Sequence, residues 1–173
     1  MRKVDFKSKI RSIPDFPKKG VIFRDITPVL ENPRAFKLLI DELVRPYRKK
    51  KIDLVVGIDA RGFLLAAPIA YKLGAGLAIV RKKGKLPYKT IVQNYDLEYG
   101  KETIEMHMDS IRPGQKVLIV DDVIATGGTL RAVADLVEKL GGKIVNISLF
   151  VELKSLKGRE KLKKYKVNSL VKF

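Results

Sequence analysis

Residues 117–130 read VLIVDDVIATGGTL and combine a strand-like apolar run with residues suited to chemistry. The aliphatic run predicts a buried strand that leads into Asp121 and Asp122. In an open parallel sheet, ligands bind outside the carboxyl ends of the strands, which is where this pair falls. Two adjacent carboxylates can accept hydrogen bonds from sugar hydroxyls, or hold Mg²⁺ through its water molecules.

The loop that follows the two aspartates suits a phosphate group. Gly127 and Gly128 let the backbone approach a ligand closely, and Thr126 and Thr129 supply hydroxyl donors. The helix predicted just beyond offers free N–H groups and the positive end of its dipole. The whole segment therefore predicts a ligand with a phosphate, a hydroxylated sugar and a metal-associated anion. A plain capped turn would explain Thr129 but not the paired aspartates.

Other familiar sites are excluded by the sequence. The P-loop pattern GxxxxGK[ST] is absent, and Gly74-Ala-Gly76 precedes a strand and lacks the third glycine of a dinucleotide fingerprint. There are no cysteines, so disulfides and thiolate metal sites are excluded. His107 is the only histidine; it falls on the polar side of an alternating segment, and we expect it to be exposed and not catalytic.

Strand and helix patterns alternate along the chain, which predicts an α/β fold with a mainly parallel sheet flanked by helices. We expect Pro68 to delay or kink its helix, and we interpret residues 1–34 as irregular. Helices are predicted over 35–48, 63–73 and 130–140. Strands are predicted over 52–58, 77–80, 117–120 and 144–151, with a hairpin formed by 91–98 and 103–108.

Length, composition and charge predict a cytoplasmic single domain over residues 1–173. No apolar run approaches the roughly 18 residues of a membrane span, and no secretory signal is recognised at the start. The formal net charge is +17, which would suit a polyanionic partner. The basic residues are scattered along the chain, however, which favours a solvated lysine-rich surface over nucleic-acid binding as the main role.

The segment VLIVDDVIATGGT resembles the phosphoribosyl pyrophosphate (PRPP) signature of the type I phosphoribosyltransferases. Further stretches extend the resemblance to the adenine phosphoribosyltransferase family over nearly the whole chain: DFPKKGVIFRDITPVL, GIDARGF, RKKGKLP, YDLEYGKETIEMH and VELKSLKGREKL. The resemblance implies the type I phosphoribosyltransferase fold, with a small N-terminal hood for the base (1–34) and a mobile flap region (82–108). The implied reaction joins adenine to PRPP, giving AMP and pyrophosphate in purine salvage.

The resemblance also assigns residues to the PRPP and AMP site. It implies that the 5′-phosphate loop consists of Ala125, Thr126, Gly127, Gly128 and Thr129, with Asp121 and Asp122 near the ribose hydroxyls. Mg²⁺ would arrive with PRPP, held by these aspartates through water and PRPP.

For the pyrophosphate, the resemblance points to Asp59 and Ala60, joined by a cis peptide bond, and to a basic loop after the next strand. The basic residues implied there are Arg81, Lys82 and Lys85. Cations placed in this way would stabilise the charge that builds on the leaving group.

Catalytic roles are implied for Arg61, Glu98 and Tyr99. Arg61 would face the leaving group, while Glu98 and Tyr99 belong to the flap. The Glu98 carboxyl would move a proton as N9 of adenine attacks C1′.

Adenine itself would be bound by the hood, where Phe23 stacks on the base and Ile22 and Arg24 read its edge through backbone groups. The resemblance further implies a homodimer with the region of Arg61 near its interface. Neither the resemblance nor the sequence suggests a membrane partner.

Two alternatives remain open from the sequence. One is a phosphoribosyltransferase for guanine, hypoxanthine or xanthine, against which the N-terminal stretch and VELKSLKGREKL argue. The other is a PRPP-sensing regulator that binds nucleic acid on the same fold. The chain has no spare segment for a helix-turn-helix, which argues against the regulator.

Overall fold

The computed structural model describes residues 5–96 and 101–173. The chain divides into two compact units, Met1–Glu42 and Leu43–Phe173. The expected hood, residues 1–34, falls within the first unit, and the main sheet with helices α4 and α5 falls within the second.

The first unit contains regular structure where the sequence led us to expect none. It holds α1 (Phe6–Lys9), β1 (Arg11–Pro14), β2 (Ile22–Asp25) and α2 (Thr27–Glu31). Strands β1 and β2 pair antiparallel, and the loop between them is fixed by the Gly20 N–H, which donates to Asp15 Oδ1 at 2.7 Å. The prediction of an irregular segment is wrong because strands of four residues are too short to show an alternating pattern.

Helix α3 (Pro33–Val44) runs across the boundary between the units and continues as a 3₁₀ turn, η1 (Arg45–Tyr47). It confirms the helix predicted over 35–48. Its apolar residues recur at helical spacing, and Leu39, Ile40 and Leu43 are buried.

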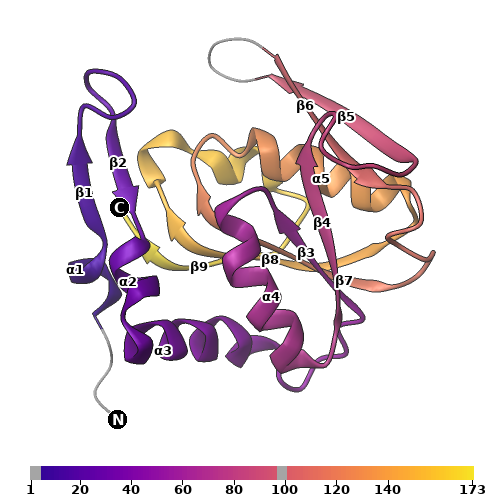
Figure 1. Ribbon diagram of the computed structural model, residues 1–173, viewed down its shortest axis with the longest axis horizontal. Coiled ribbons are helices and arrows are strands. Elements are labelled where there is room, and N and C mark those ends of the chain that lie inside the picture. Colours follow the sequence, from indigo (N-terminus) through magenta and orange to yellow (C-terminus); the bar gives the residue numbers. More distant parts are fainter. Residues whose placement is uncertain (1–4, 97–100) are drawn as a thin grey trace. The chain divides into compact units, whose positions relative to one another are not determined.

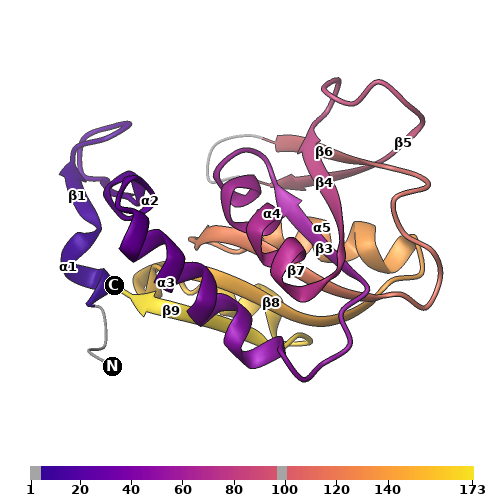
Figure 2. The same cartoon turned by 60° about the horizontal axis from the view of Figure 1, so that its bottom comes forward.

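The second unit is built on a seven-stranded sheet in the order β5-β6-β4-β3-β7-β8-β9 (Figure 1). Strands β4, β3, β7, β8 and β9 run parallel to one another, while β6 and β5 pair antiparallel at one end. Figure 2 shows the β5–β6 hairpin and β9 at opposite ends of the sheet. The α/β class and the mainly parallel sheet are confirmed. The strands are β3 (Leu54–Ile58), β4 (Gly76–Lys82), β5 (Thr90–Asp96), β6 (Lys101–His107), β7 (Lys116–Ile124), β8 (Lys143–Glu152) and β9 (Val167–Lys172).

Helices α4 (Arg61–Leu73) and α5 (Gly128–Lys139) cover opposite faces of this sheet (Figure 1). Val56 and Ile58 of β3 belong to the apolar core under α5. Gly57, between them in sequence, faces α4, where a Cβ on it would lie 2.7 Å from the Ala66 Cβ. Adjacent residues of a strand point to opposite faces, so β3 contributes to two cores.

Of the two outcomes expected for Pro68, a late start is ruled out, because helix α4 begins at Arg61 and contains Pro68 in its interior. Two other details of the second unit differ from the sequence-based expectations. Strand β7 continues through the two aspartates to Ile124. Strand β9 was not predicted; its alternating, half-exposed residues lie in a lysine-rich segment after the 3₁₀ turns η2 (Lys154–Leu156) and η3 (Gly158–Leu162).

Within the described ranges, no helix is both long and apolar enough to cross a membrane.

Candidate active site

A cavity of about 340 Å³ lies at the carboxyl ends of three neighbouring parallel strands, β4, β3 and β7. Its position is the one at which open α/β sheets bind ligands, and its size lies within the usual range of small-molecule sites. The cavity is lined by residues 58–61, 80–82 and 121–130, together with Tyr95, Glu102 and Ile104 from the β5–β6 hairpin.

The loop after β3 carries Asp59 and Ala60 into the cavity wall, and the peptide bond between them is cis, as expected. Helix α4 begins directly after this bond, so Arg61 stands in its first turn. Gly62 lies against β7: a Cβ on it would come within 2.7 Å of Asp121 Oδ1. A glycine is therefore needed here for the loop after β3 to lie close to the end of β7.

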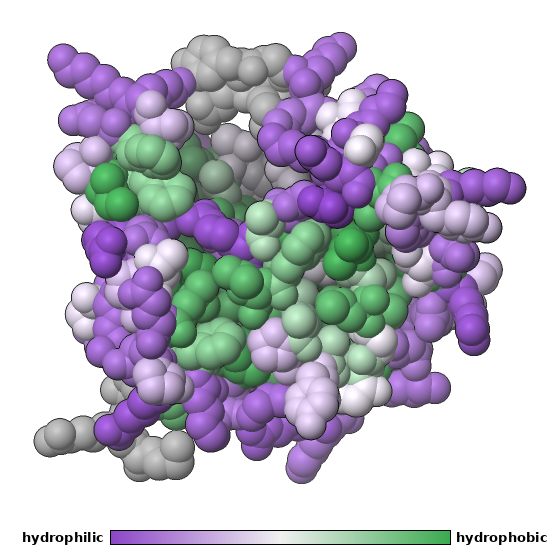
Figure 3. All heavy atoms as spheres, in the orientation of Figure 1, coloured by the Kyte–Doolittle hydropathy of each residue, from purple (hydrophilic) through white to green (hydrophobic). Residues whose placement is uncertain are grey.

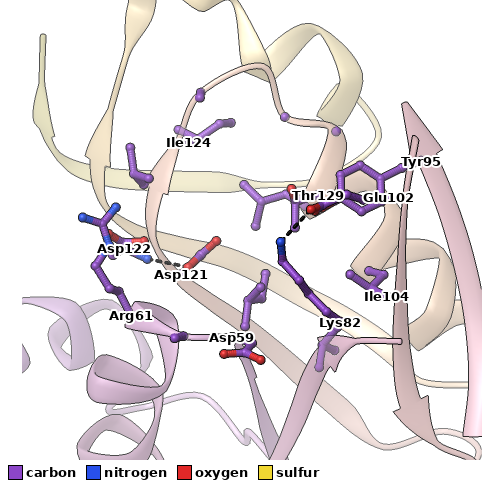
Figure 4. A pocket seen from close by; sticks show the side chains of 18 of the residues that line it. Asp59, Arg61, Lys82, Tyr95, Glu102, Ile104, Asp121, Asp122, Ile124 and Thr129 are labelled. Atoms are coloured by element: carbon purple, nitrogen blue, oxygen red, sulfur yellow. Dashed lines mark hydrogen bonds and ion pairs between the residues drawn. The ribbon is translucent and has the colours of Figure 1, made fainter. Parts of the chain in front are cut away.

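Asp121 and Asp122 stand at this end of β7, with Arg61 as the cationic partner (Figure 4). The Arg61 Nε lies 2.7 Å from Asp122 Oδ2, and the Asp122 N–H donates to Asp121 Oδ1 at 2.9 Å. Asp122 is buried, and its Oδ2 pairs with Arg61 as an ion pair but accepts no well-aligned hydrogen bond from the described residues.

Burial and the neighbouring Asp122 carboxylate raise the pKa of Asp121 well above its usual value. Burial also raises the pKa of Asp122, although Arg61 acts in the opposite direction. One guanidinium thus faces two carboxylates, and the pair retains the capacity to accept hydroxyl donors or to face a cation.

The glycine loop between β7 and α5 forms another wall of the cavity. Ala125, Thr126, Gly127, Gly128 and Thr129, the residues expected to form a phosphate loop, all line it. Gly127 has a φ of 78°, a left-handed conformation that favours glycine, and it is the residue from which α5 begins. The first N–H groups of a twelve-residue helix therefore lie at this wall, where they suit an anion.

A second glycine supports this loop from behind. A Cβ on Gly127 would lie 2.3 Å from Gly158 O, and a Cβ on Gly158 would lie 2.3 Å from Ala125 O. The two backbone segments are thus in direct contact, and neither position has room for a side chain.

The segment that contains Gly158 is held in place by the neighbouring residue, Arg159. The Arg159 guanidinium forms a bidentate pair with Glu152, with both N–O distances at 2.7 Å, and it donates to Val167 O and Ser169 Oγ. Hydrogen bonding to Arg159 lowers the pKa of Glu152 to about 2. These contacts link the phosphate loop to β8 and β9, and no single motif of the sequence revealed them.

The basic residues at the end of β4 and in the loop after it occupy different places. Arg81 and Lys82 line the cavity, and Arg81 Nε lies 3.1 Å from Asp59 Oδ2. Lys85 does not line the cavity; its carbonyl accepts a hydrogen bond from Arg81 Nη1 at 3.2 Å. The backbone here is held by buried Glu105, whose Oε1 accepts from the N–H groups of Lys85 and Leu86 at 2.9 Å each.

Two polar residues in the described lining of the cavity escaped the sequence analysis, Tyr95 and Glu102. Their strands pair so that they stand opposite each other, and Tyr95 OH donates to Glu102 Oε2 at 2.7 Å. Lys82 Nζ donates to the other oxygen, Glu102 Oε1, at 2.6 Å (Figure 4). The predicted hairpin began its second strand at residue 103 and so left Glu102 out, whereas β6 begins at Lys101 and its register places Glu102 opposite Tyr95.

Glu98 and Tyr99, for which the resemblance implied catalytic roles, lie outside the described residues. His107 was expected to be exposed, but it is only partly exposed, its Nε2 is buried, and its ring packs edge-on against Tyr88 at 6.1 Å. Glu105, which lies on the same side of the strand by alternation, is buried as well, so the side that the pattern marked as solvent-facing is largely covered.

The residues expected to bind adenine lie together on β2 of the first unit. The Phe23 ring packs edge-on against Phe16, with 5.2 Å between the ring centroids. Ile22 is half exposed, and Arg24 Nη1 donates to Ser12 Oγ on the paired strand β1.

A divalent cation would find oxygen ligands in this cavity, at Asp121 and Asp122. In the described part of the chain, however, no three acidic, histidine or cysteine side chains come together as a metal centre. The donor set therefore fits a cation that brings most of its ligands with it, such as Mg²⁺ on a phosphorylated molecule.

Comparisons with known proteins identify relatives that act on phosphoribosyl compounds. Residues 27–172 match the phosphoribosyl transferase domain family. The chain is 55% identical to the adenine phosphoribosyltransferase of Clostridium tetani (strain Massachusetts / E88) over 170 residues, covering 98% of this chain and 99% of that relative.

Solved structures give the same result. The adenine phosphoribosyltransferase of Thermoanaerobacter pseudethanolicus ATCC 33223 is 51% identical and superposes with a TM-score of 0.95, covering 98% of each chain. The enzyme of Trypanosoma brucei, solved in complex with AMP, pyrophosphate and ribose-5-phosphate, is 27% identical with a TM-score of 0.88, covering 96% of this chain and 78% of that one.

Proposed function

Because this chain belongs to the adenine phosphoribosyltransferase family, we propose that it transfers the 5-phosphoribosyl group of PRPP to N9 of adenine. The products are AMP and pyrophosphate. The observation that carries the proposal is the cavity itself, where an anion-binding loop at the start of α5 adjoins two carboxylates and a set of cations. That arrangement suits a substrate with a phosphate at one end, a sugar in the middle and a pyrophosphate at the other.

The 5′-phosphate of PRPP is assigned to the loop from Ala125 to Thr129. This assignment is supported by the left-handed Gly127, by the N-terminus of α5 and by the close backing from Gly158. The ribose hydroxyls are assigned to Asp121 and Asp122, because both line the cavity and carboxylates accept hydrogen bonds from hydroxyl donors.

The pyrophosphate is assigned to the other side of the cavity, where Asp59, Ala60 and Arg61 meet Arg81 and Lys82. As the C1′–O bond breaks, negative charge gathers on the departing pyrophosphate, and fixed cations at this place would stabilise it. Lys85 stands behind Arg81 and would act on the same group only indirectly, through its carbonyl contact.

Base binding and proton transfer are assigned to residues from two other segments. Phe23 would stack on adenine, with backbone groups of Ile22 and Arg24 reading its edge. As N9 attacks C1′, its proton would pass to Glu98, with Tyr99 beside it in the flap. Closure of that flap would exclude water, which could otherwise capture the developing cation on the sugar.

Mg²⁺ is assigned to PRPP, with Asp121 and Asp122 holding it through water. When bound, it would supply Lewis-acid assistance by neutralising charge on the leaving pyrophosphate.

We further propose a homodimer in which the outward face of α4 forms the interface. The inward residues of α4, such as Leu65 and Ile69, are buried, yet its outward residues are also apolar. Leu64 is 50% exposed and Tyr71 is 88% exposed, and nearby Leu77 on β4 is 45% exposed. Figure 3 shows apolar side chains gathered over this helix. A helix that is apolar on both faces is normally covered on both, which supports a second copy here.

The experiment that tests the proposal is a direct assay of the purified protein with PRPP, Mg²⁺ and one purine base at a time. We expect AMP from adenine, and no nucleotide from guanine, hypoxanthine or xanthine. A product from one of those bases would reassign the base specificity. An absence of any product, with PRPP still bound, would overturn the transferase proposal.

A further inference from the structure

Three side chains from three strands form a bridge across one side of the cavity. Lys82 comes from β4, Glu102 from β6 and Tyr95 from β5, and all three line the cavity wall. The two carboxylate oxygens of Glu102 are used separately: Lys82 Nζ donates to Oε1 at 2.6 Å, and Tyr95 OH donates to Oε2 at 2.7 Å (Figure 4).

This bridge gives Lys82 an anionic partner at the place where it would meet a polyanion. The Lys82 side chain is 67% exposed and points along the cavity, while the Glu102 side chain is 29% exposed. The Lys82 ammonium has three N–H donors but only one positive charge, and the part of that charge that Glu102 neutralises is not available to phosphate oxygens. Pyrophosphate and Glu102 therefore compete for the charge of Lys82.

Tyr95 allows Glu102 to release Lys82 without losing its position. Burial raises the pKa of Tyr95 to about 12, so its hydroxyl remains a donor at neutral pH. The hydrogen bond from Lys82 and, to a smaller extent, the hydrogen bond from Tyr95 lower the pKa of Glu102, which keeps its carboxylate charged. After Lys82 has turned away, Glu102 would still be hydrogen-bonded and would still be an anion.

We propose that Glu102 is an internal counter-anion for Lys82, which pyrophosphate displaces when it binds and which takes Lys82 back when pyrophosphate leaves. The inference rests on the proposed function, in which Lys82 contacts the pyrophosphate group. Glu102 is a positioning residue in this scheme, because it acts on the reaction through Lys82. Its negative charge weakens the binding of pyrophosphate and hastens its release.

The test is the substitution Glu102→Gln, which keeps the shape of the side chain and an acceptor for Tyr95 but removes the charge. We expect pyrophosphate, titrated with Mg²⁺ into the protein by calorimetry, to bind roughly threefold to tenfold more tightly, since the pair is partly exposed. Inhibition by added pyrophosphate should strengthen by the same factor, and the KM for PRPP should fall. We expect kcat to stay equal or to fall, because product release becomes slower.

The matched control is Glu138→Gln. Glu138 also pairs with a lysine, Lys164, at 2.9 Å, but it does not line the cavity. This variant removes the same charge from the molecule, and we expect pyrophosphate affinity to stay at the wild-type value.

A second comparison separates direct competition from a general effect of charge. In a Lys82→Gln background, Glu102→Gln should change pyrophosphate affinity much less than it does in the wild type, because no ammonium remains to be released. An equal effect in both backgrounds would contradict the proposal.

The outcomes for this inference and for the proposed function are distinct. If the wild type makes AMP while Glu102→Gln leaves pyrophosphate affinity unchanged or weakens it, the counter-anion proposal is overturned and the transferase stands. If the wild type makes no nucleotide from any base, the proposed function itself fails.

Discussion

Among the residues that the structure describes, Asp121 and Asp122 face one guanidinium, that of Arg61, at the end of β7. Within these described surroundings two carboxylates stand beside one cation, and burial raises the pKa of both carboxyls. Donors and cations that arrive with a substrate would relieve this imbalance. Two adjacent buried carboxylates are electrostatically unfavourable without a ligand, and the same property suits them to a ligand that brings hydroxyl groups and a metal ion.

Replacing both carboxylates tests this reasoning. Asp121→Asn with Asp122→Asn should lower kcat/KM for PRPP by roughly a hundredfold or more, because the ribose contacts and the metal-facing charge are lost together. The fold should survive, since the substitutions conserve shape and relieve buried charge. AMP formation and thermal melting measure the two effects. Retained turnover would remove the pair from the site.

The catalytic role of Glu98 rests on sequence resemblance alone. Replacing this residue tests whether it takes part in the proton transfer from adenine. Glu98→Ala should lower kcat by about a hundredfold while changing the affinity for PRPP little, because the carboxyl acts on N9 of adenine. Single-turnover rates with adenine, alongside calorimetric titration with PRPP, measure both quantities. An unchanged kcat would exclude Glu98 from the mechanism.

The lowered pKa of Glu152 predicts how the stability of the fold depends on pH. Its pKa falls from 4.5 to about 2 through the pair with Arg159, so this group stabilises the fold above its unfolded pKa and loses that contribution as pH falls toward 2. Urea unfolding should show Glu152→Gln to be less stable than the wild type at pH 7. That difference in the free energy of unfolding should shrink between about pH 4.5 and pH 2. A difference that stays constant over this range would contradict the shifted pKa.

At the scale of elements, the phosphate loop depends on a segment about 30 residues further along the chain. Gly158 contacts the loop with its backbone, and Arg159 fixes Gly158 to β8 and β9. The position of the loop is therefore set by the C-terminal part of the second unit as well as by its own glycines.

Gly158→Ala should disturb this support. Its Cβ would lie 2.3 Å from the carbonyl oxygen of Ala125, so the loop must move away. We expect the KM for PRPP to rise by roughly tenfold, with a smaller change in the KM for adenine. Gly76→Ala is the control, because the nearest atom to its Cβ is the end of the Leu54 side chain, at 3.0 Å. Equal kinetics in the two variants would refute the coupling.

The elements also show how far the sequence could lead. Helices and central strands were predictable because runs such as 52–58 and 130–140 bury one face or both at regular spacing. Strands β1, β2 and β9 were missed, since they are short or half exposed and depend on tertiary pairing. Within the cavity, the glycine loop of residues 125–129 is one continuous motif, so its place at a ligand cavity could be predicted from the sequence. The bridge from Lys82 through Glu102 to Tyr95 needs three strands in register, which a linear pattern does not reveal.

At the scale of the whole molecule, the outward face of α4 predicts self-association. Tyr71→Glu places a charge at a position that is 88% exposed in one chain but would be buried between two copies. We expect the wild type to behave as a dimer by light scattering and this variant as a monomer. Leu170→Glu on β9, also exposed and apolar at 37%, is the control and should remain a dimer. A wild type that is monomeric at all concentrations would rule out the proposed interface.

Strands β3 and β7 are each flanked by parallel neighbours on both sides, and every residue of β3 is buried. Their amide hydrogens should exchange with deuterated solvent only when the whole second unit opens, while those of β5, at the end of the sheet, escape through smaller local fluctuations. Asp121 and Asp122 therefore lie on a strand whose amide hydrogens we expect to be among the slowest to exchange. Tyr95, on β5, belongs to a part of the chain that is expected to open within the lifetime of the folded protein.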